Sequence, residues 1–169
     1  AIEAIRVEAH GFPAGLLPAV ERAMALWNHN ACNSDSDFPR FRLATDEPHR
    51  VLHVRWVKGP SPTVEGSCGA FSGNEIALYS HAHETRGGAG RSCGNSARVA
   101  EPPARELGHA LGLEDQYGAE CSGFIMGQLT RTRSGAILER RVRASECAAV
   151  DGVFLTLAER TARTEENLL

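Results

Sequence analysis

One segment of the sequence, residues 105–115 (RELGHALGLED), carries side chains whose types and spacing could support hydrolysis at a metal ion. Arg105 and His109 stand one helical turn apart and project from the same side of a helix, which is the spacing of two metal ligands. Glu106 lies beside them, where a carboxylate can take a proton from a metal-bound water. The simpler alternative is an ordinary helix with Glu106 and His109 on its surface.

Two features that follow this helix favour the metal site over the surface helix. Gly112 can adopt the left-handed conformation that ends a helix, and this turn would bring Asp115 back toward His109. Farther along, the sequence FIMG places Met126 in a turn that we expect to be buried. The helix, the glycine stop, the returning carboxylate and the methionine turn together predict one site.

This pattern resembles the metzincin clan of zinc endopeptidases, whose signature is HExxHxxGxxH/D followed by a Met-turn. With Asp115 as the third ligand, it looks most like the snapalysin group of small secreted bacterial proteases. The resemblance implies a zinc ion held by His109 and Asp115, with Glu106 as general base on a metal-bound water and a peptide or protein as substrate. Tyr117 would line the cleft and hydrogen-bond the tetrahedral intermediate, although a packing role is equally consistent with its position.

The sequence departs from that signature at the first ligand, because Arg105 stands where the family has histidine. Arginine stays protonated and offers no lone pair to a metal, whereas a catalytic zinc site of this type needs three protein ligands plus water. We therefore expect weak or absent zinc binding and impaired hydrolysis. The guanidinium is expected to pair with Glu106, Glu114 or Asp115 and to fill the position of the cation with its own donors.

Three interpretations of Arg105 stay open. The chain is a natural pseudoprotease that acts as a peptide- or protein-binding module, or it is a changed form of an active parent, or another residue completes the site. His81 and His83 are the substitutes in the third case, because a His-x-His pair at a strand end places both rings on one face. Two exposed loop histidines are the simpler alternative. The remaining histidines show no ligand spacing and are interpreted as structural or surface residues: His10, His29, His49 and His53.

Hydrophobic periodicity predicts the elements that must position the site. Alternating residues predict strands, and apolar residues at three- and four-residue spacing predict helices. The strands are expected over 2–9, 41–44, 51–57 and 74–80, and the helices over 15–28, 105–113 and 145–161. Pro102 or Pro103 suits the first turn of the active-site helix, where a missing N–H costs nothing.

This order of elements predicts an α+β fold, α/β-like in part, with a twisted, mostly parallel sheet of the metzincin type and an antiparallel edge strand. One domain is expected over 1–169, with an upper subdomain over 1–112 and a smaller C-terminal subdomain over 113–169. The first helix and the active-site helix should pack on the same face of the sheet. The C-terminal helix should pack behind the C-terminal subdomain. Strand 74–80 would be the edge that pairs antiparallel with the substrate main chain.

Composition excludes several classes of function. The 169 residues are 42% hydrophobic and 23% charged, ordinary values for a globular domain, so a disordered chain is excluded. No apolar run is long enough to span a bilayer. A net charge of −3 argues against nucleic acid as a partner. We expect a monomer.

The cysteines predict disulfides rather than a metal ribbon, because there are 5 and none forms a CxxC pair. We expect bridges between Cys121 and Cys147 and between Cys68 and Cys93, with Cys32 free. Disulfides and the resemblance to small secreted proteases imply a secreted or extracellular protein. No targeting segment is recognisable at the N-terminus, so we expect a mature form whose signal is absent or removed.

Overall fold

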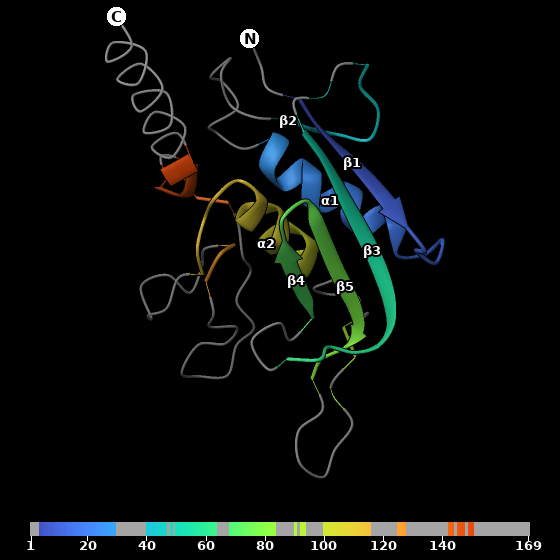
Figure 1. Ribbon diagram of the computed structural model, residues 1–169. Coiled ribbons are helices and arrows are strands. Elements are labelled where there is room, and N and C mark those ends of the chain that lie inside the picture. Colours follow the sequence, from blue (N-terminus) through green and yellow to red (C-terminus); the bar gives the residue numbers. More distant parts are fainter. Residues whose placement is uncertain are drawn as a thin grey trace, which may run out of the picture.

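The sheet and helices that position the site are defined by a computed structural model of the chain. It describes residues 4–29, 40–46, 48, 50–63, 68–83, 90, 92–93, 100–115, 125–127, 142–143, 145–147 and 149–150. The elements are β1 (Ala4–His10), α1 (Leu17–Asn28), β2 (Arg40–Arg42), β3 (Arg50–Pro60), β4 (Gly69–Ser72), β5 (Glu75–His81) and α2 (Glu101–Ala110) (Figure 1). Strands and helices together make a mixed α/β architecture, in agreement with the predicted fold class at this level.

The five strands form one mixed sheet in the order β2-β1-β3-β5-β4. β1 pairs in parallel with both β2 and β3, and β3 pairs in parallel with β5. β4 is antiparallel to β5 and forms one edge of the sheet. The prediction of a mostly parallel sheet with an antiparallel edge strand is therefore confirmed.

The predicted identity of that edge strand is wrong. β5, which corresponds to the strand expected over 74–80, is an inner strand between β3 and β4. Sequence analysis missed β4 because its residues, GAFS, include no β-branched side chain and only one aromatic side chain, so they show little preference for a strand. Gly73 and Asn74 join β4 to β5 in a tight turn, and Gly73 takes a left-handed φ of 62° there.

β3 is longer than predicted, and α2 begins and ends earlier in the chain than predicted. β3 continues to Pro60 because a shift of register between Val57 and Pro60 absorbs the Gly59-Pro60 pair that was expected to end the strand. α2 begins at Glu101, and its two prolines lie in the first turn as predicted.

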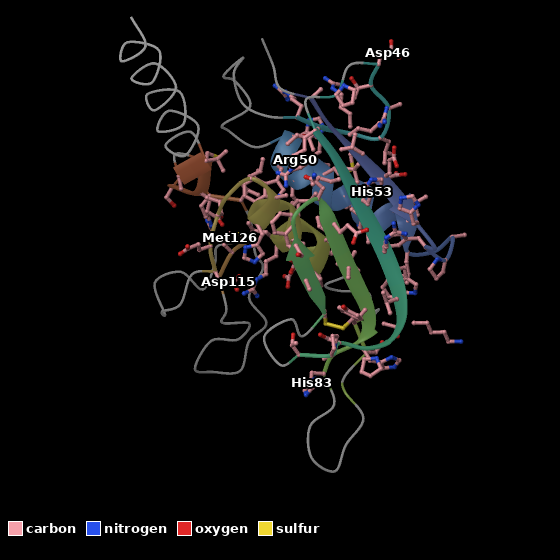
Figure 2. All side chains as sticks on the ribbon, viewed as in Figure 1. Asp46, Arg50, His53, His83, Asp115 and Met126 are labelled. Atoms are coloured by element: carbon pink, nitrogen blue, oxygen red, sulfur yellow. A yellow bond between two sulfur atoms is a disulfide. The ribbon has the colours of Figure 1, made fainter. Side chains whose placement is uncertain are left out.

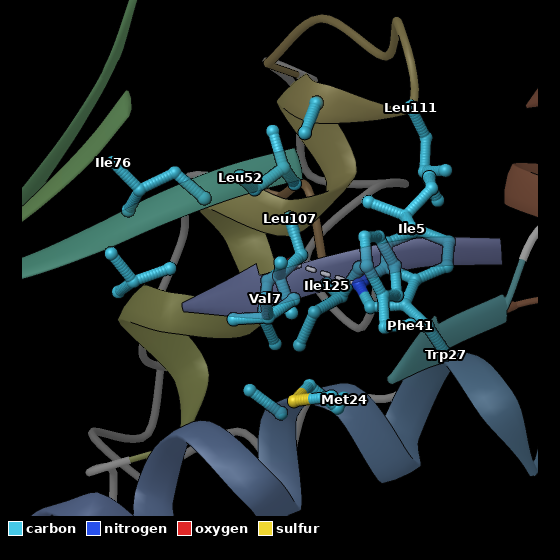
Figure 3. Packing of buried hydrophobic residues seen from close by; sticks show 14 of the residues in the cluster. Ile5, Val7, Met24, Trp27, Phe41, Leu52, Ile76, Leu107, Leu111 and Ile125 are labelled. Carbon is cyan, nitrogen blue, oxygen red and sulfur yellow. Dashed lines mark hydrogen bonds between the residues drawn. The ribbon is translucent and has the colours of Figure 1, made fainter. Parts of the chain in front are cut away.

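One face of the sheet is apolar, and both helices cover it. Alternate residues of the inner strands are buried there, including Val7 of β1, Leu52 of β3 and Ile76 of β5. Figure 3 shows these side chains in one cluster with Met24 of α1 and Leu107 of α2. Both helices lie on the same side of the sheet, as predicted (Figure 1).

The two helices contact each other at Trp27. The indole Nε1 donates to the backbone carbonyl of Ala104 at 2.8 Å. A Cβ atom added at Gly108 would lie 3.0 Å from Trp27 Cζ2 and would collide with the sulfur of Met126. Glycine at position 108 therefore lets α2 pack closely on α1 and on the methionine turn.

A disulfide joins Cys68 to Cys93, as predicted, and ties the start of β4 to the segment after β5. Cys147 is also disulfide-bonded. Its predicted partner Cys121 lies outside the described residues, as does Cys32. These bonds fit an extracellular protein.

Other predictions are tested only in part. Residues 145–147 and 149–150 are helical, in agreement with the start of the last predicted helix, whose remainder falls outside the described residues. Tyr117 also falls outside them. The division into subdomains at residue 112 stays a prediction. Among the described helices, none is long and apolar enough to cross a membrane.

Candidate functional site

The residues of segment 105–115 meet at the C-terminal end of α2. Gly112 has a φ of 94°, and the N–H of Leu113 returns to the carbonyl of Gly108 at 3.1 Å. This left-handed turn reverses the chain, as predicted from the glycine, and brings Asp115 back beside α2. Figure 2 shows Asp115 and Met126 on this side of the molecule.

Arg50, at the start of β3, fixes the end of α2 against the sheet. Its Nη1 donates to the carbonyl of Ala110 at 2.6 Å, and its Nη2 donates to the carbonyl of Gly73 at 2.7 Å. A positive charge at the C-terminal end of a helix also complements the helix dipole. The guanidinium thereby joins the turn between β4 and β5 to the helix that carries the site.

A single carboxylate oxygen collects the polar groups of the site. Asp115 Oδ1 accepts hydrogen bonds from Arg105 Nε at 2.8 Å and from Arg105 Nη2 at 2.6 Å. His109 Nε2 lies 3.1 Å from the same oxygen. The expected ion pair of Arg105 is therefore confirmed, and its partner is Asp115 among the three carboxylates considered.

His109 is oriented by a backbone carbonyl. Its Nδ1 lies 2.8 Å from the oxygen of Leu113, which can only accept, so Nδ1 carries a proton and Nε2 faces Asp115. The hydrogen bond with Asp115 raises the pKa of His109, with smaller support from the Leu113 carbonyl and from the negative charge of Glu106, against the effect of burial. A proton-donating Nδ1 held by a carbonyl is the usual second contact of a metal-binding histidine.

Asp115 stays ionised in this network. Burial acts to raise the pKa of its carboxyl, but the hydrogen bonds from His109 and Arg105 outweigh burial and lower the pKa to about 2. The carboxylate is thus fully charged at neutral pH and balances the neighbouring guanidinium.

Glu106 follows Arg105 in α2 and is buried against the edge strand. A Cβ atom added at Gly69 of β4 would lie 2.9 Å from Glu106 Cγ. Burial raises the pKa of Glu106 to about 7, although the positive charges of His109 and Arg105 act to lower it. A carboxyl group with this pKa can exchange protons near neutral pH, which suits a general acid or base.

Met126 lies against α2 at Gly108 and is buried, as predicted. Glu146, in the first turn of the last helix, accepts hydrogen bonds from the backbone N–H groups of Ile125 at 3.2 Å and Met126 at 3.0 Å. It also accepts one from the N–H of Arg143 at 2.8 Å. A buried carboxyl group therefore holds the methionine turn to the last helix. Sequence analysis missed Glu146, because this contact joins segments far apart in the chain.

His81 and His83 do not join the residues of α2. His81 Nδ1 contacts the hydroxyl of Ser80 at 2.9 Å, and His83 Nδ1 donates to the carbonyl of Ser61 at 2.9 Å. Figure 2 shows His83 beyond the end of β5, away from Asp115. Within the described ranges, neither histidine belongs to a group of three ligand atoms close enough for a metal ion.

A different group of side chains is close enough to hold a metal ion: Glu8, His10 and His53. Sequence analysis found no ligand spacing at His10 and His53, but the sheet brings both close to Glu8. Glu8 and His10 are two residues apart on β1 and share a face of the sheet, which is a signal visible in the sequence. The third residue could be found only from the register of β1 and β3, which pairs Glu8 with His53.

No protein-family model matches this sequence, and no curated protein matches it. We therefore infer the function from the chemistry of these side chains.

The residues at the end of α2 do not fit a zinc ion as they stand. Asp115 Oδ1, the oxygen facing His109, already accepts from two nitrogens of Arg105. A divalent ion about 4 Å from a guanidinium would be repelled by roughly 8 kcal/mol at an effective dielectric constant of 20. The site suits an internal ion pair rather than a bound metal.

Proposed function

We propose that this chain has the scaffold of a zinc endopeptidase of the metzincin type, most similar to the snapalysin group, in which the Arg105 guanidinium takes the position of the metal and blocks peptide hydrolysis. The observation that carries the proposal is the convergence of Arg105 and His109 on one oxygen of Asp115. His109 and Asp115, the two ligands of the signature that are present, thus lie together, and Asp115 binds the Arg105 guanidinium that takes the place of the metal.

The surroundings of this network support the same proposal. The Leu113 carbonyl holds Nδ1 of His109, which is the second contact that metal-binding histidines usually make, and Nε2 faces Asp115. Glu106 has a pKa of about 7, in the range of a catalytic base. Met126 packs beneath α2 at Gly108. An ordinary surface helix would not require these three features together.

A non-catalytic role in binding peptides is the second function that an observation favours. β4 is the edge of the sheet and packs against Glu106 through Gly69, so it borders the blocked site. An extended peptide can add to such an edge through main-chain hydrogen bonds. Capture of a peptide in this way requires neither a metal nor a charged Glu106.

The substitution Arg105→His tests the proposal. It removes the positive charge and restores the pattern HExxHxxGxxD, so the variant is expected to cleave casein in a chelator-sensitive reaction while the unchanged chain stays at background. The matched control is the double variant Arg105→His, Glu106→Gln, which keeps the restored ligand but lacks the base. Its cleavage rate is expected to be lower by about 10²- to 10⁴-fold.

Two outcomes would redirect the proposal. If the Arg105→His variant binds zinc at His109 but cleaves no peptide, the binding-module function is favoured. If the unchanged chain cleaves peptides in a chelator-sensitive way and loses that activity on His109→Ala, then Arg105 does not block the site and the proposal is wrong.

A further inference from the structure

The face of the sheet opposite the helices carries its own cluster of polar side chains. Leu52 and Val54 of β3 point into the core, so His53 between them points to the opposite face. On β1, Glu8 is the cross-strand partner of His53, and His10 follows two residues later on the same face. Two imidazoles and one carboxylate therefore meet on an open surface formed by two neighbouring strands.

The distances between the ligand atoms match the geometry of a small metal ion. His53 Nδ1 lies 3.2 Å from His10 Nε2 and 3.3 Å from Glu8 Oε2, and the two atoms on β1 are 3.9 Å apart. Ligands of a tetrahedral zinc ion, bound at about 2.0–2.1 Å, are about 3.3–3.4 Å from one another. Small rotations of side chains that are 35–40% exposed would complete such a geometry.

The chemistry of these ligand atoms also suits a bound cation. His10 Nε2 and His53 Nδ1 lie 3.2 Å apart, so they can share at most one proton between them. The nearby carboxylate oxygen of Glu8, when ionised, is an acceptor only. A metal ion would satisfy all three lone pairs at once. The second oxygen of Glu8 is occupied, because Arg6 Nε lies 3.3 Å from Oε1 and leaves Oε2 directed at the histidines.

We propose that Glu8, His10 and His53 bind a zinc-class transition-metal ion on the open face of the sheet, with a fourth position open to water. Two imidazoles and a carboxylate suit zinc, copper or nickel, whereas calcium and magnesium prefer sites made of oxygen ligands. The site is separate from the end of α2, and Figure 2 shows His53 on β3 away from Asp115. It does not depend on the function proposed above.

Two charged residues beside the site bear on its affinity. Glu75 of β5 pairs with His53 in the register and forms an ion pair with Arg55 at 3.1 Å. Arg55 is in turn the cross-strand partner of His10. These two charges offset each other. Arg6, paired with Glu8 Oε1 at 3.3 Å, is a positive neighbour of the cluster and would weaken its affinity for a cation.

The test is equilibrium dialysis of the metal-free full-length chain against zinc, followed by metal analysis. The unchanged chain is expected to bind one zinc ion, and both His53→Ala and Glu8→Gln are expected to weaken binding at least about tenfold, since even the outer partners of metal ligands contribute about 10- to 100-fold. His29→Ala, which removes an exposed histidine at the end of α1, is the matched control and should bind like the unchanged chain. Circular dichroism of each variant checks that it folds.

The proposal is overturned if the unchanged chain binds no zinc, or if His53→Ala and Glu8→Gln both bind it with unchanged affinity. Loss of binding in His109→Ala but not in His53→Ala would also overturn it, by placing the ion at α2. None of these results depends on peptide cleavage, so failure here is distinguishable from failure of the proposed protease scaffold.

Discussion

Arg105 and His109 direct three nitrogens at one oxygen of Asp115. A histidine at position 105 would add a lone pair to this point, whereas arginine adds only donors. The pKa of Asp115, lowered to about 2, means that the acceptor keeps its charge until strongly acidic pH. In the proposed function, the identity of this one side chain decides whether a metal ion or an internal ion pair occupies the end of α2.

Glu106 gives a prediction for the dependence of stability on pH. Burial raises its pKa from 4.5 to about 7, so the folded protein favours the neutral carboxyl. The unfolded chain ionises first, and the free energy of unfolding contributed by this group is lost as pH rises from about 4.5 to 7, by roughly 3 kcal/mol at most. Glu106→Gln should remove this decrease in the free energy of unfolding. Urea unfolding at pH 5 and at pH 7 checks it; an equal change for both proteins would contradict the assigned burial effect.

The sequence was informative about residues whose contacts are local. Arg105, His109 and Asp115 lie on one helix and its glycine turn, so the sequence predicted an ion pair of Arg105 with a nearby carboxylate, and the structure shows that this carboxylate is Asp115. Glu146 and His53 were missed because their partners come from other elements. The register of β1 on β3, and the contact between the methionine turn and the last helix, are tertiary properties that the spacing of residues in the chain does not encode.

At Gly108, α2 leaves no room for a side chain between itself, α1 and Met126. Gly108→Ala would place a Cβ atom 3.0 Å from Trp27 Cζ2 and against the Met126 sulfur. Overpacking of this kind costs about 1–3 kcal/mol, which exceeds the gain of up to about 1 kcal/mol that alanine brings to a helix. We expect a net loss of stability in urea unfolding.

Gly15→Ala is the matched control for this substitution, because nothing lies within 4 Å of a Cβ atom at that position. If Gly108→Ala is as stable as the Gly15→Ala variant, close packing of α2 against α1 is not what requires glycine at position 108.

Prediction of the elements succeeded where the hydrophobic pattern was distinct and failed at β4, where it was not. The 12-residue α1 and the 7-residue β1 have enough alternation or helical spacing to be recognised. The residues of β4, GAFS, lack β-branched side chains. Whether β5 is an edge or an inner strand depends on the hairpin that places β4 beside it. The strand now expected to receive a peptide is therefore β4 rather than the one predicted.

Across the whole molecule, the bond between Cys68 and Cys93 holds the edge hairpin to the segment that follows it. The bond closes a loop with a sequence separation of 25 residues. Such a loop corresponds to about 3–4 kcal/mol in the chain-entropy account of disulfides. The double variant Cys68→Ala, Cys93→Ala should therefore unfold at a lower temperature.

Thermal unfolding of this double variant without reductant checks the prediction, since the bond of Cys147 is left intact. A melting temperature equal to that of the unchanged chain would show that the bond adds no stability to the edge of the sheet.

The architecture as a whole was predictable because few arrangements bury these patterns. Strands with one apolar face and two amphipathic helices can cover a single core only if both helices pack on the same side of the sheet. The observed core follows this arrangement, with Val7, Leu52 and Ile76 facing α1 and α2. His53 and Arg55 of β3 lie on the opposite face, which is also where the Glu8 cluster lies.

Zinc stoichiometry measured in a His53→Ala background tests the central claim most directly, because that background removes the site proposed on the open face. The His53→Ala chain is expected to bind no zinc, and the double variant Arg105→His, His53→Ala is expected to bind one ion, lost again on His109→Ala. Stoichiometric zinc in the His53→Ala chain that depends on His109, or no zinc in the double variant, would contradict the claim that Arg105 takes the place of a metal.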